Sequence, residues 1–113
     1  MDKISVLKID KDCHVGRAIE QDYLALLIEV LRKHGLKVRW IKATRTRHGS
    51  HYYICISSPV DANIANRLQF LLGDDAKRVA LNQARIDSGL RDWNKLFEAA
   101  GRPLRTLYFE FPV

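Results

Sequence analysis

The order in which two kinds of hydrophobic spacing follow one another is the feature that most limits how this chain can fold. Ile4 to Ile9 is an apolar run of strand length, in which alternate side chains fall on opposite faces. Arg17 to His34 then carries apolar residues at helical spacing, and Gly35 follows as a left-handed stop. Two β-rich runs, Leu36 to Thr44 and His51 to Ser57, flank turn residues and therefore predict a hairpin.

The second half of the chain predicts mainly helices, closed by one more strand. Pro59 is expected to end the hairpin, Asp61 to cap a helix that reaches Leu72, and Gly73 to Asp75 to break that helix. The remaining predicted elements are a helix from Ala76 to Ile86, a helix from Leu90 to Ala100 that ends at Gly101, and a strand from Leu104 to Phe111.

This order of elements predicts an α+β fold of the ferredoxin-like or RNA-recognition-like kind, βαββαβ, with extra helix before the last strand. Its antiparallel sheet would have the strand order 4-1-3-2, so that the first and third strands are central neighbours. At 113 residues, 47% of them hydrophobic, the chain from 1 to 113 is expected to form a single domain with its own core.

The composition favours a cytoplasmic protein without a membrane partner. The longest apolar run, Tyr23 to Leu31, is interrupted by Glu29 and is too short to span a bilayer, and Met1 to Lys3 lead directly into a strand. Cys13 and Cys55 have no paired spacing, which gives no indication of a disulfide framework.

Positive charge gathers in one stretch of the chain. The formal net charge is +6, and no acidic residue lies between Val30 and Val60. The basic residues of that stretch are Arg32, Lys33, Lys37, Arg39, Lys42, Arg45 and Arg47, with His48 beside them. A basic strand and hairpin predict a polyanionic partner, either a nucleic acid or a nucleotide. The alternative is that Lys37, Arg39 and Lys42 are edge-strand charges that prevent aggregation.

Three ionisable residues are expected to meet at one end of the sheet. Asp10 ends the first strand and His51 begins the third, so an antiparallel pairing places them side by side. If the chain stays extended, Asp12 projects in the same direction, and two carboxylates can share Mg²⁺ or Mn²⁺. Alternatively, the two aspartates are only the polar end of a strand, and His51 is a hairpin residue that forms hydrogen bonds to backbone or water. A further alternative is a zinc site formed by Cys13, His14, His48 and His51.

Asp10-Lys11-Asp12 after a hydrophobic strand, and Arg47-His48-Gly49-Ser50-His51 opening another, resemble the first two motifs of archaeo-eukaryotic primases and primase-polymerases. The resemblance implies a small nucleotidyltransferase of DNA replication, archaeal or viral, with an RNA-recognition-like core. It implies metal binding by Asp10 and Asp12 and phosphate contact by His51. Glu110 is the formal match to the third, carboxylate motif, with Asp74 or Asp75 as the alternative.

Two readings without catalysis remain open. Tyr53 and Tyr108 on the open face could stack on bases, with Lys37, Arg39, Lys42, Arg45, Arg47 and His48 contacting phosphates, in a nucleic-acid-binding module. The same face could instead cover the interface of a homodimeric structural protein.

Overall fold

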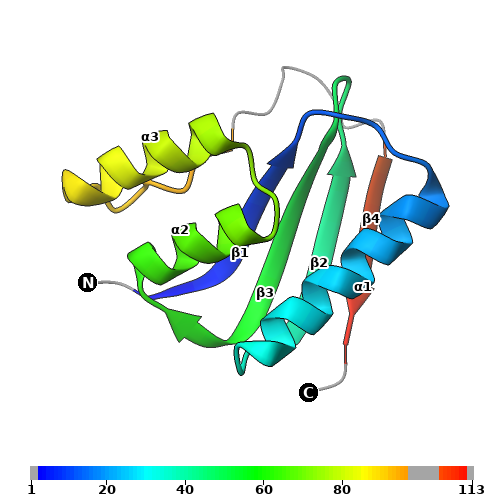
Figure 1. Cartoon of the computed structure of the whole chain (residues 1–113), viewed down its shortest axis with the longest axis horizontal. Coiled ribbons are helices and arrows are strands. Elements are labelled where there is room, and N and C mark those ends of the chain that lie inside the picture. Colours follow the sequence, from blue (N-terminus) through cyan, green and yellow to red (C-terminus); the bar gives the residue numbers. More distant parts are fainter. Residues whose placement is uncertain (1–2, 97–104, 112–113) are drawn as a thin grey trace.

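The computed structural model describes residues 3–96 and 105–111 and has a single four-stranded sheet (Figure 1). The elements in chain order are β1 (Ile4–Lys11), α1 (Arg17–Lys33), β2 (Val38–Arg45), β3 (Ser50–Val60), α2 (Ala62–Leu71), α3 (Ala76–Asp87) and β4 (Arg105–Glu110). The predicted α+β class, with its antiparallel sheet and extra helix before the last strand, is confirmed.

The order of the strands is β1-β3-β2-β4, and each neighbouring pair is antiparallel. β1 and β3 are neighbours, as predicted. The predicted place of the last strand is wrong, because β4 lies beside β2 instead of beside β1 (Figure 1). β1 is therefore an edge strand in the described part of the chain.

Side chains from α2, α3 and the loop between them occupy the hydrogen-bonding edge of β1 that a fourth strand would have used. The Lys8 N–H donates to Gln69 Oε1 at 3.0 Å, and the Asp10 N–H donates to Asp74 Oδ1 at 2.8 Å. The Lys8 carbonyl accepts from Arg78 Nη1 at 3.0 Å. These backbone groups of Lys8 and Asp10 already have hydrogen-bond partners. They are therefore not available to pair with β4.

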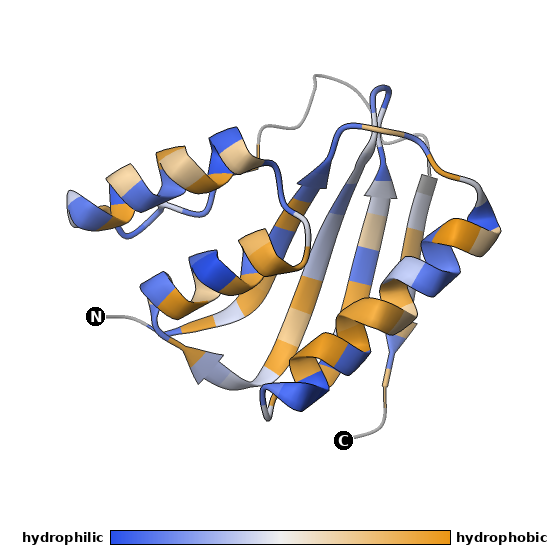
Figure 2. Ribbon diagram, in the orientation of Figure 1, coloured by the Kyte–Doolittle hydropathy of each residue, from blue (hydrophilic) through white to orange (hydrophobic). Residues whose placement is uncertain are grey.

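The core lies between the sheet and the two helices α1 and α2, which cover the same face (Figure 1). Orange, apolar segments recur along α1 and along the strands beneath it in Figure 2. The fully buried side chains of this layer include Leu7, Leu31, Ile41, Tyr52 and Ile54. Period-two alternation of the strands explains this result, since it sends these strand residues to the helical side and Lys8, Lys42 and Tyr53 to the other.

Two predicted boundaries are corrected. β3 does not end at Pro59 but continues to Val60, because the register against β1 shifts between Ile4 and Val6 and such an irregularity tolerates a proline. The predicted helix from Leu90 is absent over residues 90–96, the described part of that range. There Gly89 ends α3 with φ of 80°, and Trp93 and Asn94 are buried. The rest of that predicted helix, and Leu104 of the predicted last strand, lie outside the described residues.

None of the helices within the described ranges is long and apolar enough to span a bilayer.

Candidate functional site

The face of the sheet opposite α1 and α2, called the open face here, carries a row of alternating lysine and tyrosine. Cross-strand register aligns Lys8 of β1, Tyr53 of β3, Lys42 of β2 and Tyr108 of β4. The Lys42 ammonium lies 5.6 Å from the centre of the Tyr53 ring, within cation–π range. Tyr108 is 56% exposed, so it presents an aromatic surface to solvent.

A further aromatic residue extends this row toward one end of the sheet. Trp40 of β2 is half-buried, and its ring centre lies 5.9 Å from that of Tyr108 with the planes inclined at 31°. Rings at this separation interact with each other and still present faces to a third ring. The open face therefore combines three aromatic side chains with two ammonium groups.

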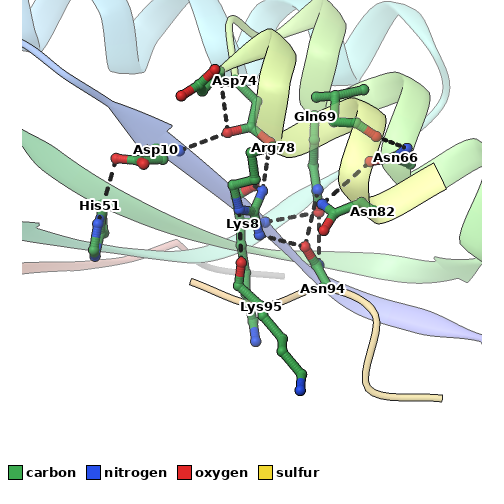
Figure 3. Close-up of polar contacts among 12 residues, drawn as sticks. Lys8, Asp10, His51, Asn66, Gln69, Asp74, Arg78, Asn82, Asn94 and Lys95 are labelled. Carbon is green, nitrogen blue, oxygen red and sulfur yellow. Dashed lines mark hydrogen bonds and ion pairs between the residues drawn. The ribbon is translucent and has the colours of Figure 1, made fainter. Parts of the chain in front are cut away.

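The next row of cross-strand partners includes Asp10 and His51, which lie side by side as predicted. The two residues are register partners, and His51 Nε2 lies 3.4 Å from Asp10 Oδ1 (Figure 3). His51 is only 5% exposed, and Thr44, its partner on β2, is 3% exposed. Among the described residues, His51 Nδ1 and Thr44 Oγ1 have no hydrogen-bond partner. Buried polar atoms without a partner are costly, so this row departs from the usual satisfaction of buried polar groups.

The two other carboxylates of the predicted metal site occupy different places relative to Asp10. Asp12 is exposed and lies beyond the end of β1. Glu110 pairs with Trp40 on the far edge of the sheet, whereas the row of Asp10 reaches β4 at Thr106. Within residues 3–96 and 105–111 there is no group of three or more His, Cys, Asp or Glu side chains placed to hold a metal ion. That finding also gives no support to a zinc site at the hairpin.

The alternative third carboxylates have other tasks. Asp74 Oδ1 accepts hydrogen bonds from the Asp10 and Asp75 N–H groups, and its Oδ2 accepts from Arg78 Nη1. Asp75 caps α3 by accepting from the Lys77 N–H at 2.8 Å. Burial raises the pKa of Asp74, and the hydrogen bonds and the guanidinium charge of Arg78 oppose that rise.

The predicted basic residues are spread along β2 and its hairpin and do not form one cluster. Lys37 and Arg39 lie at the start of the strand, and Arg47 and His48 lie exposed in the turn at its other end. Arg45 donates to the Val15 carbonyl at 3.2 Å and so helps to hold the β1–α1 loop. The hairpin end is thus fixed to that loop, while Arg47 and His48 remain available to an anion.

Gly49 explains why the hairpin lies so close to the end of β1. A Cβ at this position would stand 1.7 Å from the Lys11 carbonyl oxygen, so only glycine fits. His14 Nε2 and the Thr46 carbonyl oxygen, 2.6 Å apart, make a second connection between the same two segments. The predicted turn residue therefore also sets the distance between the two motifs.

A buried polar cluster beside β1 was not predicted from the sequence (Figure 3). Its buried members are Asn66, Gln69, Asp74, Arg78, Asn82 and Asn94. Gln69 and Asn94 exchange two amide hydrogen bonds, of 3.1 and 2.8 Å, and Arg78 Nη2 donates to Asn94 Oδ1 at 2.7 Å. The available signal was the spacing of Asn66 and Gln69, which fall on the stripe of α2 that otherwise holds Ala62, Ala65, Leu68 and Leu72.

Comparison of the chain with family models, with curated proteins and with solved structures found no match in any of the three.

Proposed function

We propose that this protein binds single-stranded nucleic acid on the open face of its sheet. The observation that carries the proposal is the row of alternating lysine and tyrosine across all four strands, on the face that α1 and α2 leave uncovered. Unpaired bases stack on exposed aromatic rings at about 1–3 kcal/mol per base, and ammonium groups beside the rings attract the phosphates.

The geometry favours a single strand over a duplex. Tyr108 and Trp40 offer ring faces, which a strand with unstacked bases can use and a paired duplex cannot. Lys42 stands between Tyr53 and Tyr108 in the register, with its ammonium 5.6 Å from the Tyr53 ring centre, a position suited to the backbone that links two stacked bases. The exposed Arg47 and His48 at the hairpin extend the positive surface beyond the rings.

Fluorescence anisotropy with labelled ten-nucleotide oligo(dT) and oligo(rU) tests this proposal. Tyr108→Ala is expected to weaken binding about tenfold, the effect of one lost stacking interaction. Phe70→Ala is the matched control, because Phe70 on α2 is 57% exposed and lies outside the row. Lys42→Gln is expected to weaken binding and to reduce its salt dependence, whereas Lys33→Gln on α1 changes neither. Equal affinities for the Tyr108 and Phe70 variants would refute the proposal.

The second candidate function is metal-dependent nucleotidyl transfer, and the meeting of Asp10 with His51 is the observation that favours it. The proposed roles are metal binding for Asp10 and Asp12, and contact of His51 with a phosphate. Titration with Mn²⁺, followed by paramagnetic broadening of backbone amide signals, tests this candidate. Broadening confined to Asp10, Asp12 and His51 would support it, and the absence of any local effect would rule it out. Alanine at both aspartates separates the two functions, since strand binding is expected to survive.

A further inference from the structure

A cavity of about 200 Å³ lies beside β1, and nothing in the proposed binding face makes use of it. α3 and the segment after it, residues 95–96, line the cavity, and Asp10 forms part of its rim. The strand-binding row lies across the open face of the sheet, whereas this cavity lies at the β1 edge. It is therefore a separate feature that has its own chemistry.

Most of the charged side chains that line the cavity and can contact a ligand are basic. Lys77, Arg85 and Lys95 line it. Within residues 3–96 and 105–111, only Lys95 of these three forms an ion pair, with the exposed Asp92 at 3.8 Å. Arg85 donates one hydrogen bond, of 3.3 Å, to Asn82 Oδ1, which leaves most of its five N–H donors unused. Such a group of donors suits an anion with several oxygens.

The carboxylates near the cavity are already engaged. Asp75 accepts from the Lys77 N–H at the start of α3, and Asp74 behind the wall is bound to Arg78. Asp10, which faces His51, and the capping Asp75 are the two carboxylates in the lining. A ligand held here therefore meets the cations of Lys77, Arg85 and Lys95 and two carboxylates, one of which already caps α3.

Arg78 makes the wall of the cavity rigid. Its guanidinium donates to the carbonyls of Lys8 and Lys95, at 3.0 and 2.9 Å, and so fixes the segment that carries Lys95 to β1 (Figure 3). The buried amide of Asn94 is held by the same guanidinium. Arg78 is thus a positioning residue, and the site that it shapes exists before any ligand arrives.

The size and the apolar part of the lining limit the ligand further. Leu81 is 56% exposed on the cavity side of α3, and Leu96 lies in the same lining. Pockets for complete drug-sized ligands measure about 300–1,000 Å³, so this cavity is too small for a whole nucleotide with its base. Leu81 and Leu96 offer an apolar surface suited to a sugar ring, the cations suit its phosphate, and Asp10 can accept from a sugar hydroxyl.

We propose that the cavity binds the phosphate monoester of a phosphorylated sugar, such as the 5′-phosphate end of a nucleic-acid strand or of a free nucleotide. A monoester carries close to two negative charges at neutral pH and three terminal oxygens, and these match the three available cations. An internal phosphodiester carries one charge and continues the chain in both directions, which suits a small cavity less well.

The test is an NMR titration of the ¹⁵N-labelled full chain with ribose 5-phosphate, and with ribose as the matched neutral sugar. Ribose 5-phosphate is expected to shift the Arg85 side-chain Nε–H signal and the amides of Lys77 and Lys95, and ribose to leave them in place. Arg85→Gln and the more conservative surface change Lys95→Gln are each expected to weaken binding about tenfold, the loss typical of one charge-assisted hydrogen bond. Arg67→Gln on the outer side of α2 is expected to have no effect.

Oligo(dT) with a 5′-phosphate or a 5′-hydroxyl separates the two sources of the ligand. A preference for the phosphorylated strand that disappears in Lys95→Gln assigns the cavity to strand ends. Equal binding of both strands, together with binding of ribose 5-phosphate, assigns it to free sugar phosphates. Because the titration uses no strand, failure of the open face to bind nucleic acid would leave this result unaffected. Ribose 5-phosphate that binds no better than ribose, or equally well to Arg85→Gln, would overturn the proposal.

Discussion

Replacement of Arg78 by methionine is the most demanding test of how the helices hold the edge of β1. Methionine keeps much of the length of the side chain but removes the charge and every hydrogen-bond donor. Asp74 would then be a buried carboxylate without its counter-ion, and the carbonyls of Lys8 and Lys95 would lose their donor. The perturbation therefore acts on one cluster without changing the rest of the core.

The expected cost follows from the burial of the pair. Removal of one partner of a buried ion pair costs about 3–5 kcal/mol, and a domain of this size has only about 5–15 kcal/mol in total. At about 4 °C per kcal/mol, the melting temperature should fall by roughly 12–20 °C. The exposed Arg67 on α2 provides the control, since Arg67→Met should change the free energy of unfolding by less than about 0.5 kcal/mol.

Urea unfolding followed by tryptophan fluorescence, to which the buried Trp93 and the half-buried Trp40 both contribute, measures this cost. The double variant Asp74→Asn/Arg78→Met removes both charges, so it should be less destabilised than the sum of the single variants by 1 kcal/mol or more, as a rough estimate for coupled sites. Hydrogen exchange of the Lys8 and Asp10 amides should accelerate in Arg78→Met beyond the change in global stability. A loss below about 1 kcal/mol, or strict additivity in the double variant, would refute the assignment of a structural role to this pair.

Three shorter predictions test other parts of the fold. Gly49→Ala should lower the free energy of unfolding by about 2 kcal/mol or more, because its Cβ would overlap the Lys11 carbonyl. Gly16→Ala, whose Cβ would have no atom within 4 Å, should lower it by at most about 1 kcal/mol. Chemical denaturation that gives equal losses for the two variants would contradict the close approach. Burial raises the pKa of Tyr52, so above about pH 10 the unfolded chain releases a proton that the folded protein keeps, and stability falls as the pH rises. In Tyr52→Phe, the fall in stability between about pH 9 and 11 should be smaller. An unchanged slope would be evidence against the raised pKa. Asp61→Ala should lower the unfolding free energy by about 1 kcal/mol through loss of the α2 cap, measured against the exposed Asp22→Ala, which should have no such effect.

Local signals in the sequence were sufficient for most of the elements. α1 begins at Arg17 as predicted and ends at Lys33, and Gly35 has φ of 76°, the left-handed value that suits glycine. Asp61 accepts from the Ile64 N–H at 2.9 Å, as expected of a cap. These features depend on residues within a few positions of one another, and for that reason sequence patterns predict them.

The candidate site was predictable only in part. Antiparallel pairing of β1 with β3 brings Asp10 to His51, and this follows from strand order and period alone. The cavity beside Asp10 depends on how α3 and residues 95–96 pack, which no spacing in the sequence encodes. Glu110 was a candidate because it lies in a hydrophobic strand, but it pairs with Trp40, away from the row of Asp10.

The choice of that edge connects the polar cluster with both proposed sites. Gln69, Asp74 and Arg78 satisfy the outer edge of β1, so β4 pairs with β2 and places Tyr108 in the row of Lys42 and Tyr53. If β4 had paired with β1 instead, its backbone would have taken the place of these side chains at the edge where the cavity and Asp10 now meet. The same buried cluster therefore favours the pairing that completes the row with Tyr108 and leaves space for an anion at the β1 edge.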